Sequence, residues 1–140
     1  MAEFTNGALQ TVAANGNVLF ADTPVRSGAS VYHRAGSGVV RLSGNTCQRR
    51  ALYKVTFGAN VAIPTGGTVG PITLAISVDG EPLASATMIE TPAAVEEFSN
   101  VFSAVLIAAE CGCCATVAVV NIGPDPIDVQ NANLIVDRVA

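Results

Sequence analysis

Apolar and polar residues alternate along three segments of this chain, and this alternation predicts β-strands with one dry face and one wet face. The segments are SGVVRLSG at 37–44, ALYKVTFGANV at 51–61 and IDVQNANLIVDRV at 127–139. Each contains Val, and Gly, Asn or Pro residues separate them. We expect residues 37–57 to pair with residues 127–139 and to close an all-β unit whose termini lie side by side.

Turn-forming residues recur at short intervals along the whole chain and divide it into short strands. Asp79-Gly80 is the clearest hairpin signal, because Asp-Gly favours the turn that matches strand twist. This spacing is typical of a sandwich or barrel. We expect a single domain over residues 1–140, with residues 1–8 as an N-terminal extension. The expected strands are 9–13, 18–20, 30–32, 39–42, 52–62, 72–78, 84–89, 101–107, 115–121 and 127–139.

Residues 92–110 fit two periodicities. The Thr91-Pro92 pair is a helix start signal, and apolar residues follow at helical spacing. From Asn100 onwards, however, the residues also alternate as in a strand. The all-β pattern on both sides favours a loop followed by a strand, although residues 93–107 keep a helix as the alternative. The helical set is Val95, Phe98, Phe102, Val105 and Ala109, and the strand sets are Val101, Ser103, Val105 and Ile107 against Phe102, Ala104 and Leu106.

The packing follows from the same alternation. Tyr53, Val55 and Phe57 should share one face of their strand, and Lys54 and Thr56 the other. We expect Tyr53, Val55, Phe57, Leu134 and Val136 to lie in the core or in a subunit interface.

Composition indicates a subunit of a larger assembly. Half of the residues are hydrophobic, but only 13% are charged and 5% aromatic, so small Ala and Val side chains supply much of the apolar content. A surface with so few charges exposes apolar area, which usually marks an interface.

Charge and hydropathy also exclude some partners. The net charge is −4, and no basic run exists, so we expect no nucleic-acid ligand. No stretch reaches the length of about 18 apolar residues that a membrane span needs, and residues 1–16 do not resemble a secretory signal peptide. We therefore expect a protein made in the cytosol, which would reach the outside of a cell only by another route, such as lysis or assembly into a particle.

The β-patterns resemble the tumour necrosis factor and complement globular-head superfamily, in its bacterial and phage-encoded branch. The similar features are the short strand Gly38-Val39-Val40-Arg41-Leu42, the aromatic strand with Tyr53, Val55 and Phe57, the Asp79-Gly80 hairpin and the closing strand 132–136. The resemblance covers residues 9–139 and implies a ten-stranded jelly roll that assembles as a compact homotrimer. Two features depart from the family: aromatic residues are few, and no collagen-like Gly-X-Y repeat precedes the domain.

The resemblance implies a non-enzymatic structural or assembly protein, a trimeric module of a phage virion or similar surface particle. The alternative is a carbohydrate- or receptor-binding head of a phage fibre or of a spore or cell-surface protein. Its partners would be further copies of itself and other virion or surface-layer proteins. We expect no catalytic residues and no cofactor, because no paired acids, nucleophile with its base, or cofactor loop is present.

The four cysteines are the strongest candidate site. Cys47 stands in a turn, and Cys111, Cys113 and Cys114 precede a strand. Three interpretations stay open. They are one or two disulfides that link Cys47 to the cluster, buried thiols, and a zinc site, which the adjacency of Cys113 and Cys114 disfavours. We expect no metal.

The remaining candidates are interpreted as structural. His33 has no acid partner nearby in sequence, and Gly66, Gly67 and Gly70 lack the residues of a phosphate loop. Tyr32 is the only aromatic platform that we expect for a sugar. Two acidic pairs lack the spacing of a calcium loop, and an arginine pair is expected in a solvated turn. These are Glu96-Glu97, Asp125 with Asp128, and Arg49-Arg50.

Overall fold

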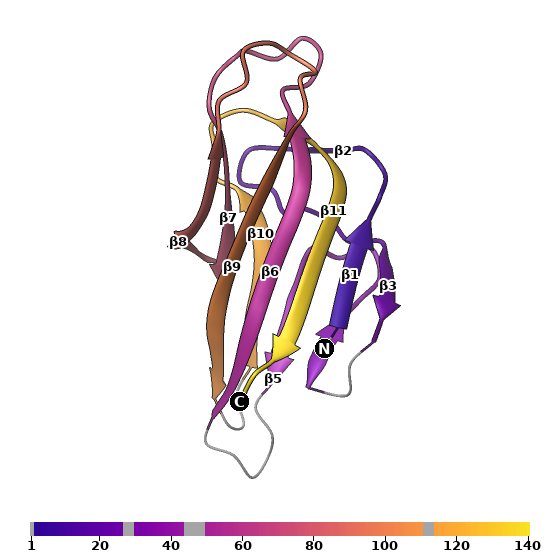
Figure 1. Cartoon of the computed structure of the whole chain (residues 1–140), viewed down its shortest axis with the longest axis vertical. Coiled ribbons are helices and arrows are strands. Elements are labelled where there is room, and N and C mark those ends of the chain that lie inside the picture. Colours follow the sequence, from indigo (N-terminus) through magenta and orange to yellow (C-terminus); the bar gives the residue numbers. More distant parts are fainter. Residues whose placement is uncertain (1, 27–29, 44–49, 111–113) are drawn as a thin grey trace.

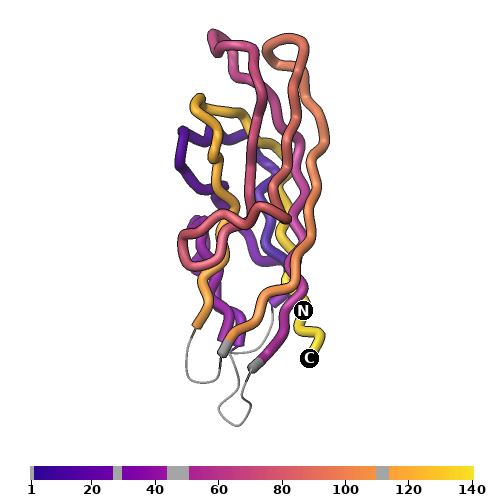
Figure 2. Tube along the Cα trace, turned by 90° about the vertical axis from the view of Figure 1, so that its left-hand side faces the viewer, coloured from indigo at the N-terminus to yellow at the C-terminus, as the bar shows by residue number. Residues whose placement is uncertain are grey.

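Two antiparallel β-sheets pack face to face in this protein (Figure 1). The computed structural model describes residues 2–26, 30–43, 50–110 and 114–140, except the side chains of Arg50 and Glu110. Turned by 90°, the two layers stand beside each other along the long axis (Figure 2). The described residues form eleven strands and no helix, which confirms the expected all-β jelly-roll sandwich.

The first sheet holds both ends of the chain. Its order is β3-β1-β11-β6-β9, with β2 also paired to β11. Ala2 pairs with Val136, so the termini lie side by side as expected (Figure 1). β6 pairs with β11 over most of its length. The bounds are β1 (Ala2–Asn6), β2 (Gln10–Val12), β3 (Asp22–Val25), β6 (Arg50–Ala62), β9 (Ser99–Glu110) and β11 (Ile127–Arg138).

The second sheet has the order β4-β5-β10-β7-β8. The expected Asp79-Gly80 hairpin joins β7 to β8, and both residues have positive φ, 52° and 86°, as a twist-matched two-residue turn requires. The bounds are β4 (Val31–His33), β5 (Val40–Ser43), β7 (Ile72–Val78), β8 (Glu81–Glu90) and β10 (Cys114–Asn121).

The core fills the space between the sheets. Tyr53, Val55 and Phe57 point inward from β6 and are fully buried, and Leu134 and Val136 on β11 are buried beside them. These five side chains therefore lie in the core of the chain itself. The Tyr53 hydroxyl also donates a hydrogen bond to the Ser43 carbonyl oxygen at 2.7 Å, which ties the first sheet to β5 of the second.

Three expectations about strands need correction. The expected N-terminal extension contains β1, which pairs with β11, and β3 was not anticipated. Residues 18–20 form no strand, because Val18 bonds to Val119 while the following residues have no continuous partner. β5 also lies in the second sheet and not beside β11. One expected strand is lost and two are added, which turns the expected ten into eleven.

Residues 99–110 form a strand, β9, so the helical alternative for residues 93–107 is wrong. β9 is longer than expected because it pairs with β6 from Ser99 to Glu110. The described part of the chain contains no helix with the length and apolar character needed to cross a membrane.

Candidate assembly face

β9 is an edge strand of the first sheet and carries apolar side chains on both of its faces. The inward residues Val101, Ile107 and Ala109 are at most 7% exposed. The outward residues Phe102 and Leu106 are each 64% exposed, although both are large and apolar. A strand on an open face normally alternates apolar with polar residues, so the outward side of β9 departs from the pattern of a solvated surface.

Small and apolar residues on the neighbouring strands extend this surface. Phe102 lies opposite Gly58 of β6, and a Cβ placed on Gly58 would lie 3.9 Å from the Phe102 ring. Further residues of the same side follow from the pairing of the strands. We define the assembly face as the outward side chains of β9, β6 and β11 from Phe102 to Leu106 and opposite them: Phe102, Ala104, Leu106, Thr56, Gly58 and Ile135.

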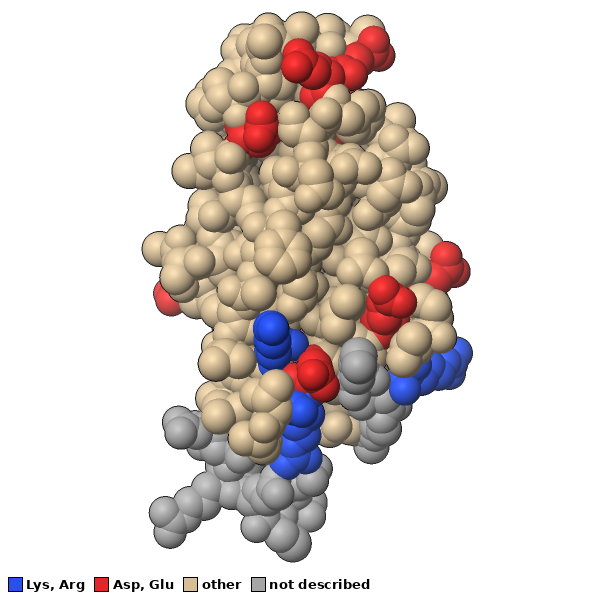
Figure 3. Space-filling view, viewed as in Figure 1, with Lys and Arg blue, Asp and Glu red and all other residues tan. Residues whose placement is uncertain are grey.

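Polar residues bound the assembly face at both ends of the strands. At one end, the carboxamides of Asn100, Asn60 and Asn131 form a chain across β9, β6 and β11, with N–O distances of 3.3 and 3.1 Å. At the other end, Lys54, which lies opposite Leu106, and its neighbour Asp137 face outward. Figure 3 shows a charge-free middle between Asp and Glu residues above and a mixture of Lys, Arg, Asp and Glu residues below. This apolar area with a polar rim has the anatomy of a protein–protein interface.

The candidate cysteines lie mostly outside the described residues, which exclude Cys47, Cys111 and Cys113. Cys114 begins β10, where it is exposed and pairs in register with Ser43. The choice among disulfide, thiol and metal ligand therefore stays a prediction.

His33 and Tyr32 lie on β4, and each has a partner. His33 is half-buried, with Nε2 at 2.8 Å from the Ser37 carbonyl oxygen and its ring 4.7 Å from that of Phe4. This packing is that of a structural histidine. Tyr32 is 56% exposed, but the Arg41 guanidinium covers its ring at 5.3 Å from the centroid. The expectation that Tyr32 is the only exposed aromatic platform is wrong, because Phe98 and Phe102 are also exposed.

The acidic candidates are held by local contacts. Glu96 accepts a hydrogen bond from the Thr65 hydroxyl, and Asp128 accepts one from Thr11 at 2.8 Å. No group of three His, Cys, Asp or Glu side chains converges on a possible metal site among the described residues. Gly66, Gly67 and Gly70 lie in the loop between β6 and β7, and Arg49 is outside the described residues.

Reasoning from sequence found the strand that carries the assembly face but missed the face itself. The alternation places Phe102 and Leu106 in the second of two apolar sets on this strand. A second apolar set indicates an exposed apolar surface, and this surface is absent from the expectations. The usable signal was a strand that is apolar on both faces at the edge of an antiparallel sheet, where one face is normally polar.

Several solved structures share this architecture. The Eiger TNF of S. frugiperda superposes with a TM-score of 0.73 at 15% identity, covering 99% of this chain and 91% of that one. The globular domain of the zebrafish complement 1qA protein gives 0.62 at 12% identity, covering 96% and 94%. The PRD1 vertex protein P5 gives 0.51 at 14% identity, covering 99% and 96%.

No family model and no curated protein matches the sequence. At identities this low, the similarity establishes the architecture and not the activity. The protein has a jelly-roll fold similar to that of the Eiger TNF and of the complement 1qA globular domain.

Proposed function

We propose that this protein is a non-enzymatic assembly module, a homotrimeric jelly roll that forms part of a phage virion or a similar surface particle. The assembly face on β9, β6 and β11 is the surface through which its subunits associate. A three-fold assembly joins two different surfaces of each subunit, so the face of one copy packs against another part of the next.

One observation carries this proposal: two large apolar side chains, Phe102 and Leu106, are each 64% exposed on the outward side of β9. Burying a Leu or Phe side chain stabilises an assembly by about 1.5–3 kcal/mol. When a second copy of the chain covers the assembly face, these side chains are buried and the assembly gains this stabilisation. Association is therefore favoured over a solvated monomer.

The structural comparisons support a role in assembly. The protein shares its fold with a vertex protein, PRD1 P5, and with two globular heads of the superfamily. The sequence resemblance implied a trimer, and the low content of charged residues, 13%, fits a chain with buried intersubunit area.

Sedimentation velocity of paired variants tests the proposed face. Phe102→Asp places a charge within it, opposite Gly58 and not opposite a cationic side chain, and an unpaired buried charge disfavours association strongly. Leu19→Asp is the matched control, because Leu19 is 46% exposed and lies near Gly38, away from β9. We expect Phe102→Asp to sediment as a folded monomer and Leu19→Asp to sediment as the wild type does.

Far-ultraviolet circular dichroism of both variants confirms that each is folded. If Phe102→Asp is folded and keeps the wild-type oligomeric state, the assembly face is not the interface. Loss of assembly in both variants would also refute it, because the effect would then not depend on the position of the charge.

A further inference from the structure

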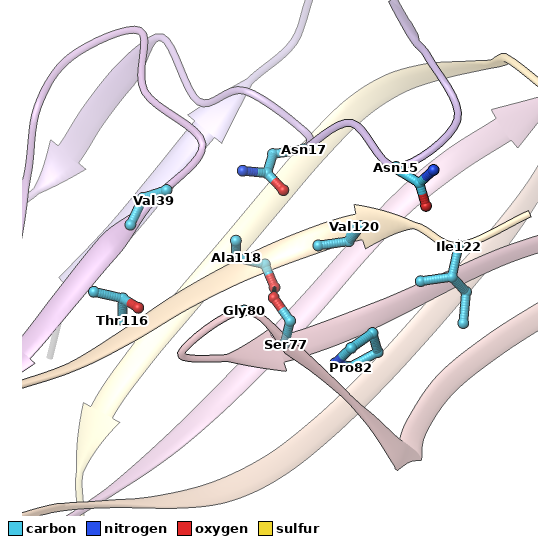
Figure 4. Close-up of a pocket in the computed structure, with 10 residues that line it drawn as sticks. All are labelled: Asn15, Asn17, Val39, Ser77, Gly80, Pro82, Thr116, Ala118, Val120 and Ile122. Carbon is cyan, nitrogen blue, oxygen red and sulfur yellow. Dashed lines mark hydrogen bonds between the residues drawn. The ribbon is translucent and has the colours of Figure 1, made fainter.

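A hollow of about 500 Å³ lies on the outer side of the second sheet, away from the assembly face. We define this outer groove by its floor and its two walls. The floor is formed by Thr116, Ala118 and Val120 of β10, with Ser77 of β7 beside them (Figure 4). The groove is deepest over Ala118 and Ser77, because their side chains are small and the side chains around them are larger.

The first wall is the segment 15–18, which bonds to β10 beyond the part of β10 that pairs with β5. β5 pairs only with residues 114–117 of β10. Beyond that point, the Val18 amide donates to the Val119 carbonyl oxygen and the Asn15 amide to the Asn121 carbonyl oxygen, both at 2.8 Å. Asn15 and Asn17 therefore stand beside β10 and line the groove (Figure 4).

The second wall comes from the start of β8. The pairing of β7 with β8 shifts register between Ala75 and Ser77, and Ser77 pairs with Pro82. Gly80 and Pro82 line the groove on this side. Segments far apart in the sequence thus build one concave site, whose volume lies in the range of small-molecule sites, about 300–1,000 Å³.

The groove offers hydrogen bonds but no charge. All of its lining residues are uncharged. Within the described part of the chain, the carboxamides of Asn15 and Asn17 have no hydrogen-bond partner. Each carboxamide can donate two hydrogen bonds and accept others. The Ser77 hydroxyl donates to the Ala118 carbonyl oxygen at 3.2 Å and keeps its capacity to accept.

This chemistry selects among ligand classes. Phosphates and carboxylates are bound by cationic groups, and none lines the groove. An extended peptide gains affinity by pairing with a free strand edge, whereas β10 is already paired on both sides. A sugar ring presents C–H groups on its face and neutral hydroxyls at its edge, which match an apolar floor with carboxamides at the rim.

We propose that the outer groove binds a neutral saccharide, with its C–H face over Ala118 and Val120 and its hydroxyls bonded to Asn15 and Asn17. This binding site goes beyond the proposed assembly role and does not depend on it. No aromatic residue lines the groove to add stacking energy, so the affinity of one site falls in the millimolar range.

Three variants separate binding from folding. Ala118→Leu fills the floor while leaving the strand pairing intact. The double variant Asn15→Gly with Asn17→Ala removes both carboxamides, and Gly tolerates the positive φ of 63° at position 15. Asn131→Gly is the matched control, because Asn131 has a φ of 58° and lies on the other sheet.

Saturation-transfer NMR of the full-length protein measures binding directly. The probes are glucose, galactose, N-acetylglucosamine, lactose and chitobiose, with N-acetylneuraminic acid, glucose 6-phosphate and a capped tetra-alanine peptide as comparators. We expect transfer to the C–H protons of at least one neutral sugar. Loss of each carboxamide hydrogen bond should weaken binding about two- to tenfold, Ala118→Leu should abolish it, and Asn131→Gly should leave it unchanged.

Other results would overturn the proposal. No transfer to any of the five neutral sugars would show that the groove binds none of them. Equal or stronger transfer to a charged comparator or to the peptide would refute the ligand class. Transfer that survives both Ala118→Leu and the double variant, with melting temperatures showing that they are folded, would place binding elsewhere. None of these results depends on the oligomeric state.

Discussion

Asn121 is fully buried and joins three parts of the fold that are distant in sequence. Its side-chain nitrogen donates to the carbonyl oxygens of Val12 at 3.2 Å and Asp125 at 2.9 Å. Its side-chain oxygen accepts from the Gly123 amide at 3.0 Å. One carboxamide thereby holds the end of β2 and the turn before β11 against the end of β10.

Replacing Asn121 with Ala should therefore be costly. The substitution leaves two carbonyl oxygens and one amide without their partner inside the protein, so we expect a loss of about 3 kcal/mol in unfolding free energy. Asn60→Ala is the matched control, because its carboxamide lies on the outer face, and we expect its cost to stay below about 1 kcal/mol. Urea unfolding measures both, and equal effects would contradict the role given to Asn121.

Phe57 tests the packing between the two sheets. It is fully buried on β6, and its ring meets that of Phe20 edge-on at a centroid distance of 6.3 Å. Phe57→Ala should lower the unfolding free energy by about 3–5 kcal/mol because it leaves a cavity. Thr56→Ala, on the outward face of the same strand, is the control. An unchanged melting temperature for Phe57→Ala would contradict the packing.

At the scale of elements, the strands with regular alternation could be predicted and the irregular ones could not. β7 was predicted with its observed bounds, and β6 and β11 nearly so, because their alternation runs over many residues. β3 has only four residues and contains Pro24, which a strand tolerates at a sheet edge and which hides the pattern. Residues 18–20 do alternate in burial but lack the partner that would make them a strand.

The assembly face and the outer groove differ in how strongly the sequence indicates them. The assembly face belongs mainly to one strand, so the second apolar set of β9 carried a signal. The outer groove could not be predicted, because Asn15, Ser77, Pro82 and Ala118 meet only through the order of strands. A local pattern along one strand can be read from the sequence, whereas a groove depends on contacts between distant segments.

The cysteine prediction also belongs to this scale. Ser43 pairs with Cys114, and Arg50 pairs with Glu110. In the sequence, Cys47 lies between Ser43 and Arg50, and Cys111 and Cys113 lie between Glu110 and Cys114. In air-exposed protein we expect Cys47 to be bonded to one member of the cluster, and such a bond to stabilise the fold by about 3–4 kcal/mol. Cys113 and Cys114 should not pair with each other, because adjacent cysteines form a strained bond.

Non-reducing peptide mapping, with metal analysis of the same sample, decides between the alternatives. Four free thiols without metal would contradict the disulfide and leave the thiol interpretation. Zinc in a one-to-one ratio with the chain would contradict both.

For the whole molecule, charge and apolar area are separated along the long axis. The middle of the first sheet is uncharged, with acidic residues towards one end and both acidic and basic residues towards the other (Figure 3). Three copies related by a three-fold axis would bury the uncharged middle and keep the charged ends in solvent. We therefore expect the protein to assemble, with the assembly face buried between its subunits.

Multi-angle light scattering of the wild-type protein at micromolar concentration tests this claim most directly. We expect a single species with about three times the chain mass of 14.2 kDa. A species with the mass of one chain at that concentration would contradict it, because the exposed Phe102 and Leu106 would then have no second copy to cover them.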